Sequence, residues 1–307
     1  MLDVALLGTG GMMPLPNRFL TSMLCRFNGR GLMIDAGEGT QVTLKMLGWG
    51  CKNIDVICFT HFHADHISGL PGLLLTISNS GRTEPLTLVG PPDLELVVRS
   101  ICVIARDLMF PLEFRELEAR KPSALRLGEF NLRTLPMCHG ISCLGYAIEI
   151  PRKGRFDAER AKRLPIPVQL WSGLQKNECV EYNGTVYTSD MVLGPERKGL
   201  KLCYCTDSRP VSGLADFVRQ ADLFICEGIY GEEEKKNKAV EYGHMLFSEA
   251  AEAARDGEVS ELWLTHFSPS LTDPKSFLKN ALNIFPNTSV GYDRICKTLY
   301  FQDDNGT

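Results

Sequence analysis

The chain has 307 residues, of which 44% are hydrophobic and 23% are charged, and its formal net charge is −4. These proportions are typical of a folded globular protein and exclude the disordered and fibrous classes. Because the net charge is negative, a nucleic acid or an anionic membrane would have to bind a local basic patch. The length fits either two domains or one large α/β or sandwich unit.

The chain carries no signal for a membrane or for secretion. No apolar stretch approaches the roughly 20 residues that a membrane-spanning helix needs, and the first residues enter a strand-like run without a basic segment. The 11 cysteines are odd in number and include no Cys-x-x-Cys pair, which favours reduced thiols. We therefore expect a cytoplasmic protein.

Short β-rich runs alternate with helix-length amphipathic segments, which is typical of an α/β fold. The expected strands are Val4–Leu7, Gly31–Ile34, Ile54–Phe59, Leu86–Val89, Asn131–Met137, Gly145–Ile150, Lys201–Tyr204, Leu223–Cys226, Glu261–Leu264 and Lys297–Phe301. The expected helices are Gln41–Leu47, Leu70–Ser78, Leu94–Ala105, Leu214–Gln220, Phe247–Asp256 and Pro274–Phe285. Asp273 is predicted to cap the last helix, with Pro274 in the first helical position.

The segment from Pro151 to Gly199 breaks this alternation, because it has prolines and turn signals but little periodicity. We interpret it as an insertion carried by the core. Its first part contains six basic residues against two acidic ones, a local charge of +4. These six are Arg152, Lys153, Arg155, Arg160, Lys162 and Arg163. A solvated helix face and a phosphate-binding surface both fit this cluster.

The strongest chemical signal is a group of histidines that follows the expected strand Ile54–Phe59. His61, His63, Asp65 and His66 supply four metal-binding groups within six residues. In extended backbone at the end of a strand, the alternation of His61 and His63 points both imidazoles to the same side. This spacing indicates a metal site.

Further metal-binding groups follow other expected strands. His139, Asp207 and His266 each come directly after an apolar strand and before a turn, which would gather them along one edge of the sheets. Five histidines and two carboxylates are too many for one tetrahedral ion and suit two. The donor set favours zinc, with manganese or iron as weaker options. A two-metal site of this kind is suited to the hydrolysis of phosphodiesters.

The pattern of ligands resembles the metallo-β-lactamase superfamily, and within it the ribonuclease Z family of tRNA 3′-processing endonucleases. The similarity extends over most of the chain. Its motifs are Leu7-Gly8-Thr9-Gly10 with Pro14 and Arg18, Asp35-Ala36-Gly37-Glu38-Gly39-Thr40-Gln41, Gly69-Leu70-Pro71-Gly72-Leu73-Leu74, Thr206-Asp207-Ser208-Arg209 and Leu264-Thr265-His266-Phe267-Ser268. The resemblance implies a single αββα domain over residues 1–307 with an inserted, protruding, substrate-binding arm at 151–199.

The resemblance also implies a zinc-dependent phosphodiesterase that removes the 3′ trailer from precursor tRNA by metal-activated water, in a homodimer. Two zinc ions are implied per subunit, with manganese as a substitute. The implied ligands are His61, His63 and His139 for one ion, Asp65, His66 and His266 for the other, and Asp207 bridging both.

Roles for the remaining residues follow from the same resemblance. Asp65 would also act as general base. His244 would assist at the scissile phosphate, and Glu227 would orient its imidazole. Asp35 would support a ligand imidazole from behind. The basic cluster of the insertion would contact tRNA phosphates.

Two features depart from the family pattern. The usual tip of the arm is replaced by the apolar run Ile166–Trp171, and Ser268-Pro269-Ser270-Leu271 lacks the arginine of the family's Ser-x-Arg-Tyr. An alternative therefore stays open, a metal-dependent phosphodiesterase acting on small or cyclic nucleotides or on another ester. A non-catalytic nucleic-acid-binding scaffold predicts lost metal ligands, and none is lost.

Overall fold

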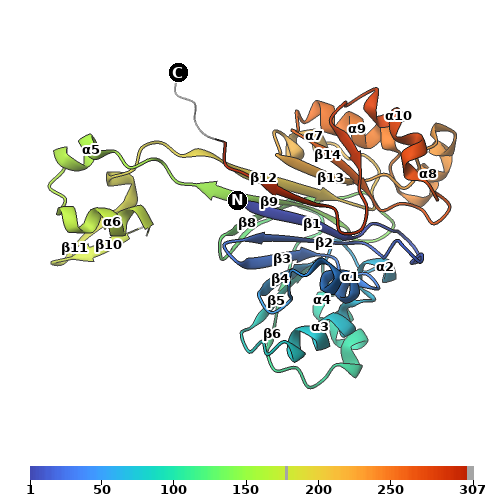
Figure 1. Cartoon of the computed structure of the whole chain (residues 1–307), viewed down its shortest axis with the longest axis horizontal. Coiled ribbons are helices and arrows are strands. Elements are labelled where there is room, and N and C mark those ends of the chain that lie inside the picture. The colour runs from blue at the N-terminus through green and yellow to red at the C-terminus, as the bar shows by residue number, and fades with distance from the viewer. Residues whose placement is uncertain (177–178, 303–307) are drawn as a thin grey trace. The chain divides into compact units, whose positions relative to one another are not determined.

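A computed structural model describes residues 1–176 and 179–302 of the chain (Figure 1). It divides into two compact units. The first contains Met1–Glu149 and Lys201–Tyr300, and the second contains Ile150–Leu200 with Phe301 and Gln302.

The first unit is built on two seven-stranded sheets. The first sheet has the strand order β16 (Cys296–Leu299), β1 (Leu2–Gly8), β2 (Ser22–Phe27), β3 (Arg30–Ile34), β4 (Ile54–Cys58), β5 (Leu86–Gly90) and β6 (Leu112–Glu116). The second has the order β15 (Thr288–Val290), β14 (Leu262–Thr265), β13 (Leu223–Glu227), β12 (Arg197–Cys205), β9 (Leu144–Arg152), β8 (Phe130–Pro136) and β7 (Ala124–Leu127). Strands β3 to β6 pair in parallel, as do β12 to β15.

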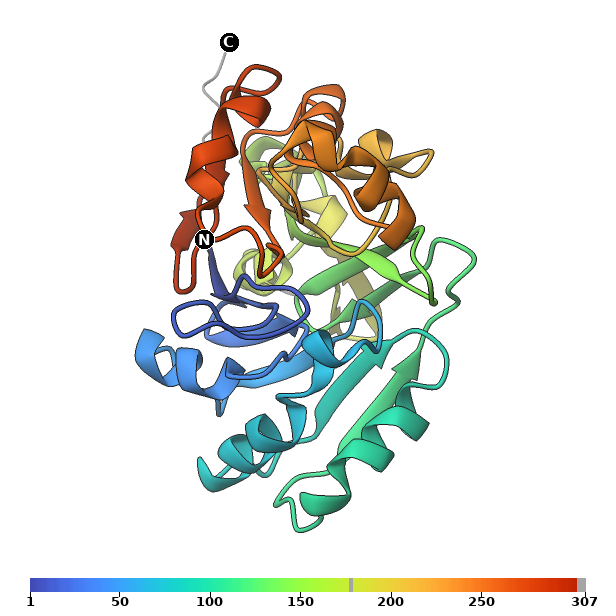
Figure 2. The ribbon, with the colours of Figure 1, turned by 90° about the vertical axis from the view of Figure 1, so that its right-hand side faces the viewer.

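Helices cover the outer face of each sheet, so that the first unit is an αββα sandwich (Figure 2). The helices with the first sheet are α1 (Thr40–Leu47), α2 (Ala64–Ile67), α3 (Leu70–Asn79) and α4 (Leu94–Ile101), which runs into the 3-10 turn Cys102–Ile104. Those with the second sheet are α7 (Leu214–Val218), α8 (Lys236–Tyr242), α9 (Phe247–Asp256) and α10 (Leu278–Leu282), with 3-10 turns at Glu233–Lys235 and Pro274–Phe277.

Each sheet forms its own core with its helices. Leu73 and Ile77 of α3 pack in one buried cluster with Ile57 of β4, and Phe247 of α9 packs in another with Phe224 of β13. The two sheets also contact each other directly. The buried Tyr146 hydroxyl donates a hydrogen bond of 2.7 Å to the carbonyl oxygen of Phe59. This contact joins β9 to the end of β4, where the histidine motif begins.

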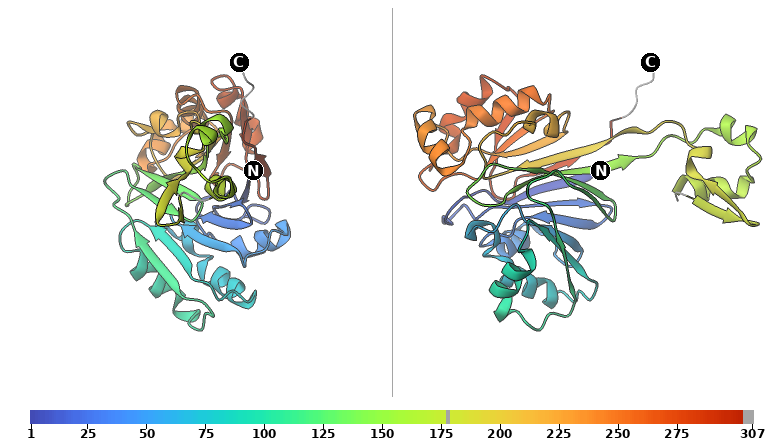
Figure 3. Two further views of the ribbon diagram at one scale, coloured as in Figure 1. Left: turned by 90° about the vertical axis from the view of Figure 1, so that its left-hand side faces the viewer. Right: turned by 180° about the vertical axis from the view of Figure 1, so that it is seen from behind.

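The second unit has a small core of its own (Figure 3, right, green and yellow). Its elements are α5 (Ala158–Arg163), α6 (Val168–Lys176), the hairpin of β10 (Cys179–Tyr182) and β11 (Thr185–Thr188), and a 3-10 turn at Ser189–Met191. Ile166, Leu170 and Leu174 are buried in it. The Trp171 ring packs against Phe156 with 5.3 Å between ring centroids, and its Nε1 donates to the Ile166 carbonyl.

This core corrects our interpretation of the run Ile166–Trp171. The sequence suggested an apolar tip unsuited to phosphate, but Ile166, Leu170 and Trp171 pack into the core and stabilise the unit, and of the large apolar side chains of the run only Val168 is exposed. The expected lack of regular structure here was also wrong. Helices α5 and α6 are short and bury only a few apolar residues in a small core, so the hydrophobic periodicity of their sequence is weak.

The strands and helices expected in the first unit are present, with ends shifted by a few residues. The sequence pattern missed β2, β6, β7, β15 and the short helices α2 and α8. The last expected helix begins as a 3-10 turn and ends at Leu282 rather than Phe285, and Asp273 caps it by accepting from the Lys275 amide, as predicted. Within residues 1–176 and 179–302, none of the helices has the length and hydropathy needed to cross a membrane.

Candidate metal centre

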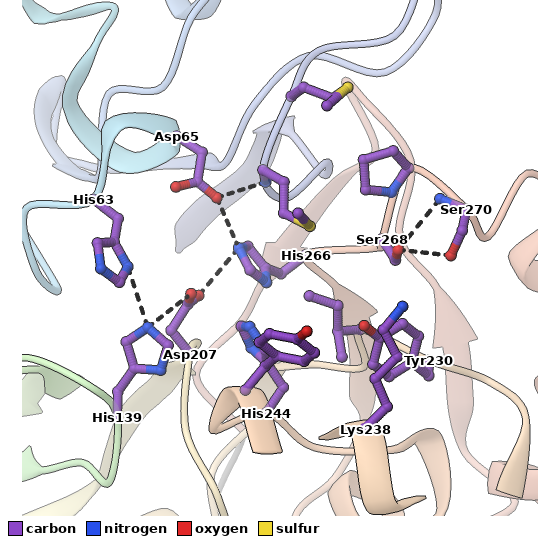
Figure 4. A pocket seen from close by; sticks show the side chains of 15 residues that line it. His63, Asp65, His139, Asp207, Tyr230, Lys238, His244, His266, Ser268 and Ser270 are labelled. Atoms are coloured by element: carbon purple, nitrogen blue, oxygen red, sulfur yellow. Dashed lines mark hydrogen bonds and ion pairs between the residues drawn. The ribbon is translucent and has the colours of Figure 1, made fainter. Parts of the chain in front are cut away.

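The metal-binding side chains predicted from the sequence come together in the first unit, at the ends of its strands (Figure 4). His61 and His63 follow β4, and Asp65 and His66 lie on α2. The other predicted ligands follow three more strands: His139 comes after β8, Asp207 after β12 and His266 after β14. Because β4, β12 and β14 belong to parallel parts of their sheets, their carboxyl ends bring these loops to one edge.

Three residues of this edge share an unusual backbone conformation. Asp35, Asp207 and His266, each the first or second residue after a strand, have φ angles of 59°, 50° and 58°. This left-handed region costs a non-glycine residue roughly 1–2 kcal/mol. The backbone also passes unusually close to one of them, because a Cβ on Gly11 would lie 2.7 Å from Cε1 of His266. The fold therefore accepts local strain where it turns these side chains toward the site.

The imidazole nitrogens face one another at distances that suit a shared cation. His61 Nε2 lies 3.0 Å from Nδ1 of His63, and that Nδ1 lies 3.2 Å from Nε2 of His139. On the other side of Asp207, Nε2 of His66 lies 3.2 Å from Nε2 of His266. Two nitrogens bound to one tetrahedral zinc at 2.0–2.1 Å are about 3.3 Å apart. The residues present therefore fit divalent metal ions.

The Asp207 carboxylate lies between the two groups of histidines. Its Oδ1 is 3.2 Å from Nε2 of His66 and 3.1 Å from Nε2 of His266, whereas its Oδ2 is 3.6 Å from Nε2 of His61 and 3.7 Å from Nε2 of His139. Burial opposes ionisation of Asp207, but the surrounding imidazoles hold its pKa well below the usual range. A carboxylate with one oxygen toward each group can bridge two cations.

Asp35 lies behind the ligands and contacts one of them. Its Oδ2 is 2.7 Å from Nδ1 of His66, and the Thr60 amide and hydroxyl also donate to the carboxylate. Both Asp35 and His66 are fully buried. A carboxylate on Nδ1 fixes the imidazole tautomer that presents Nε2 to a metal.

Asp65 is held by the loop that follows β1. The backbone amide of Met12, a residue with φ of 66°, donates a hydrogen bond of 2.7 Å to Asp65 Oδ2. The same oxygen lies 3.4 Å from Nε2 of His266. Although burial opposes its ionisation, the neighbouring imidazoles of His266 and His66 lower the pKa of Asp65 below its ordinary value. Sequence reasoning missed Met12, because its contribution comes from backbone rather than from side-chain chemistry.

His244 and Glu227 form a pair at the side of the ligands. Nδ1 of His244 lies 3.0 Å from Oε2 of Glu227, which is completely buried at the end of β13. Burial alone would lower the pKa of His244, but the Glu227 carboxylate raises it to about 9. At neutral pH the imidazole is therefore a proton donor held in a fixed orientation.

A pocket of about 500 Å³ opens over this centre. His63, Asp65, His139, Asp207, His244 and His266 line it, whereas His61, His66, Asp35 and Glu227 support them from below. The pocket also includes the run 268–270, which the sequence singled out as lacking the family's arginine, and residues that the sequence did not indicate, namely Met12, Met13, Ile229, Tyr230, Lys238 and Tyr242. The basic cluster from Arg152 to Arg163 is not part of this lining and belongs to the second unit.

The two helix-covered sheets and the cluster of histidines and aspartates at their edge define a metallo-β-lactamase fold. Solved structures support this assignment. The short form of human tRNase Z aligns with a TM-score of 0.69 and 23% identity over 96% of this chain and 98% of its own. The metallo-β-lactamase fold protein YhfI from Bacillus subtilis aligns with a TM-score of 0.68 and 18% identity, over the same shares.

Curated relatives define the family more closely. The ribonuclease Z of Clostridium kluyveri is 54% identical over 99% of this chain and 100% of its own length, and that of Clostridium acetobutylicum is 49% identical over the same shares. The chain belongs to the ribonuclease Z family, and is thus an enzyme of the metallo-β-lactamase superfamily. A family model described as anti-Pycsar protein Apyc1 also matches, over residues 2–99.

Proposed function

We propose that the chain is a metal-dependent endoribonuclease that removes the 3′ trailer from precursor tRNA. The observation that carries this proposal is the full-length similarity to ribonuclease Z, joined to a site in which one carboxylate faces two groups of histidines. The alternative, a phosphodiesterase for small or cyclic nucleotides, is not favoured, because the full-length relatives carry the ribonuclease name.

The two groups of ligands suit two divalent ions, which we assign as zinc, with manganese able to replace it. His61, His63 and His139 would hold one ion, Asp65, His66 and His266 the other, and Asp207 both. When bound, the ions neutralise charge on the scissile phosphate and increase the acidity of water. Asp35 keeps His66 in the tautomer that this binding requires.

The remaining steps belong to protein side chains. Asp65, held by the Met12 amide, takes a proton from the attacking water as its oxygen bonds to phosphorus. The bond from phosphorus to the 3′ oxygen breaks, and His244 gives its proton to that oxygen. Glu227 keeps the imidazole oriented and protonated. The tRNA is left with a 3′ hydroxyl and the trailer with a 5′ phosphate.

The second unit is proposed as a tRNA-binding arm inserted within a single metallo-β-lactamase domain. Phosphate contacts require accessible cations. The unit exposes five of the six basic residues, namely Lys153, Arg155, Arg160, Lys162 and Arg163, and Arg152 is half-buried. We further assign a homodimer and a cytoplasmic location to the chain. Replacing Lys162 or Arg163 by glutamine should in each case reduce by about one the magnitude of the slope of the logarithm of the tRNA binding constant against the logarithm of salt concentration. The control Lys45→Gln should leave this slope unchanged.

The test is cleavage of a precursor tRNA with a 3′ trailer, in the presence of zinc or manganese. We expect one cut at the 3′ end of the tRNA, and a loss of at least about 100-fold in Asp65→Ala. A small diester such as bis(p-nitrophenyl) phosphate is assayed in parallel. Cleavage of that diester without cleavage of the precursor would contradict the assignment of tRNA as substrate while leaving the hydrolytic centre in place.

A further inference from the structure

The pocket over the metal centre has a second half whose chemistry the hydrolytic reaction does not use. Its lining is apolar and aromatic, with Met12, Met13 and Tyr242 exposed by 63%, 55% and 53% of their surfaces. Tyr230 and Ile229 form its buried floor. Flat aromatic and polarisable methionine side chains at the rim of a pocket suit a planar ring.

One lysine, Lys238, lies in this half of the pocket. Among the described residues that line the pocket, Lys238 is the only lysine or arginine, and no described carboxylate pairs with it. Its ammonium lies 5.4 Å from the centre of the Tyr230 ring. Lys235, on the same ring at 5.3 Å, differs because Glu232 neutralises it. Lys238 thus has charge available for an anionic ligand at the pocket.

The position of these residues relative to His244 indicates which part of the substrate would lie against them. Lys238 and Tyr242 are four residues apart on α8, so they share one face of the helix that leads into His244. In the close-up view, Lys238 and Tyr230 lie on the opposite side of His244 from His63 and His139 (Figure 4). In the proposed reaction His244 protonates the 3′ oxygen, so the nucleoside that carries this oxygen must lie beside it.

We propose that this half of the pocket binds the last nucleoside of the mature tRNA, with Tyr242 stacked on its base and Lys238 paired with the phosphate on its 5′ side. The inference rests on the proposed function, since it needs an RNA strand cut at that nucleoside. Stacking accepts any base, because each has a π face, and Lys238 contacts only the backbone. The subsite therefore positions the strand without selecting its sequence.

The experiment pairs each side chain with the group that it contacts. Three precursor tRNAs are compared: unmodified, without the base of the last tRNA nucleoside, and with an uncharged methylphosphonate on the 5′ side of that nucleoside. The enzymes are the wild type, Tyr242→Ala, Lys238→Met, Lys238→Arg and the control Lys236→Met, an exposed lysine on α8 outside the pocket lining. The value of kcat/KM is measured for every pair.

We expect the wild type to lose about tenfold in kcat/KM with each modified RNA. Tyr242→Ala should lose about tenfold on the unmodified RNA but nothing more when the base is absent. Lys238→Met should likewise show no further loss with the methylphosphonate, Lys238→Arg should retain most activity, and Lys236→Met should match the wild type.

The subsite would be overturned if, in both pairs, the loss caused by the substitution multiplied with the loss caused by the matching RNA modification. Provided that the wild type cleaves the unmodified precursor efficiently, the proposed function would remain intact. The same conclusion follows if neither variant loses activity on the unmodified RNA. Failure of the wild type to cut the unmodified precursor at its 3′ end would instead refute the proposed function, and the subsite with it.

Discussion

Oδ2 of Asp35 lies 2.7 Å from Nδ1 of His66, and neither side chain is exposed to solvent. The contact leaves Nε2 of His66 free to face His266 and the Asp207 carboxylate. Asp35, the residue after β3, thereby fixes the tautomer of His66, a predicted metal ligand on α2.

Asp35→Asn removes the negative charge while keeping the size of the side chain. We expect zinc affinity to fall by about 10–100-fold, because His66 loses the partner that fixes its tautomer. Competition with a chelating dye measures the affinity, and Asp3→Asn, a surface position paired with Arg26, is the control. Equal zinc affinity in Asp35→Asn and the wild type would exclude the orienting role.

The left-handed backbone at His266 should lower the free energy of unfolding. In the metal-free protein, we expect His266→Gly to be more stable than His266→Ala by roughly 0.5–1 kcal/mol. Relief of about 1–2 kcal/mol of strain is partly offset by the greater freedom of unfolded glycine. The free energy of unfolding in urea is the measurement. At the exposed helical position Glu252 the order should reverse, with glycine less stable than alanine by about 1 kcal/mol.

Glu227→Gln should slow the chemical step without weakening substrate binding. The glutamine can still contact His244, but it no longer raises the pKa of the imidazole, so the proton donor is depleted. We expect kcat on precursor tRNA to fall by about 10–100-fold with little change in KM. Single-turnover kinetics test this. A rise in KM at constant kcat would assign Glu227 to substrate binding instead.

Trp171→Ala should loosen the second unit alone. The variant loses the contact with Phe156, and because Trp171 is only half-buried we expect the unit to be destabilised by about 2–3 kcal/mol, below the range of a fully buried tryptophan. Limited proteolysis should then cut within residues 150–200 while hydrolysis of bis(p-nitrophenyl) phosphate continues. Val168→Ala, on the exposed face of α6, should behave as the wild type. Parallel loss of zinc binding would show that the two units do not unfold separately.

The exposed and the buried thiols should form two kinetic classes. Cys138, Cys179 and Cys296 are exposed and free, so they should react with Ellman's reagent in the native protein within minutes. The buried thiols should react only after unfolding, because burial raises the pKa of Cys102 to about 11 and of Cys203 to about 12. Mass spectrometry after labelling identifies the modified positions. Rapid native labelling of Cys203 would show that the core opens locally.

The sequence could predict that the histidines and aspartates of the candidate metal centre come together, because each follows an apolar strand, and the ends of strands can be recognised in a single sequence. The Met12 amide could not be predicted, because its contact with Asp65 depends on loop backbone and leaves no compositional signal. Trp171 was misread for a related reason. In a segment without periodicity, the sequence does not show whether an apolar side chain lies on the surface or in a core. Trp171 lies in a core because it packs against Phe156, fifteen residues earlier. Helix α8 is short and charged, so nothing in its sequence distinguished the pocket-lining Lys238 from the other lysines of the segment.

The separate core of the second unit bears on how this enzyme can evolve. Its apolar residues are satisfied by one another, so a substitution there is tested against neighbours inside the same fifty-residue insertion. Under the proposed role of the second unit as a tRNA-binding arm, mutations that change tRNA recognition can accumulate there without disturbing the histidines and aspartates of the first unit. Under that proposed role, a different insertion could replace this one as a whole, provided that β9 and β12 still leave and re-enter the second sheet at the same places.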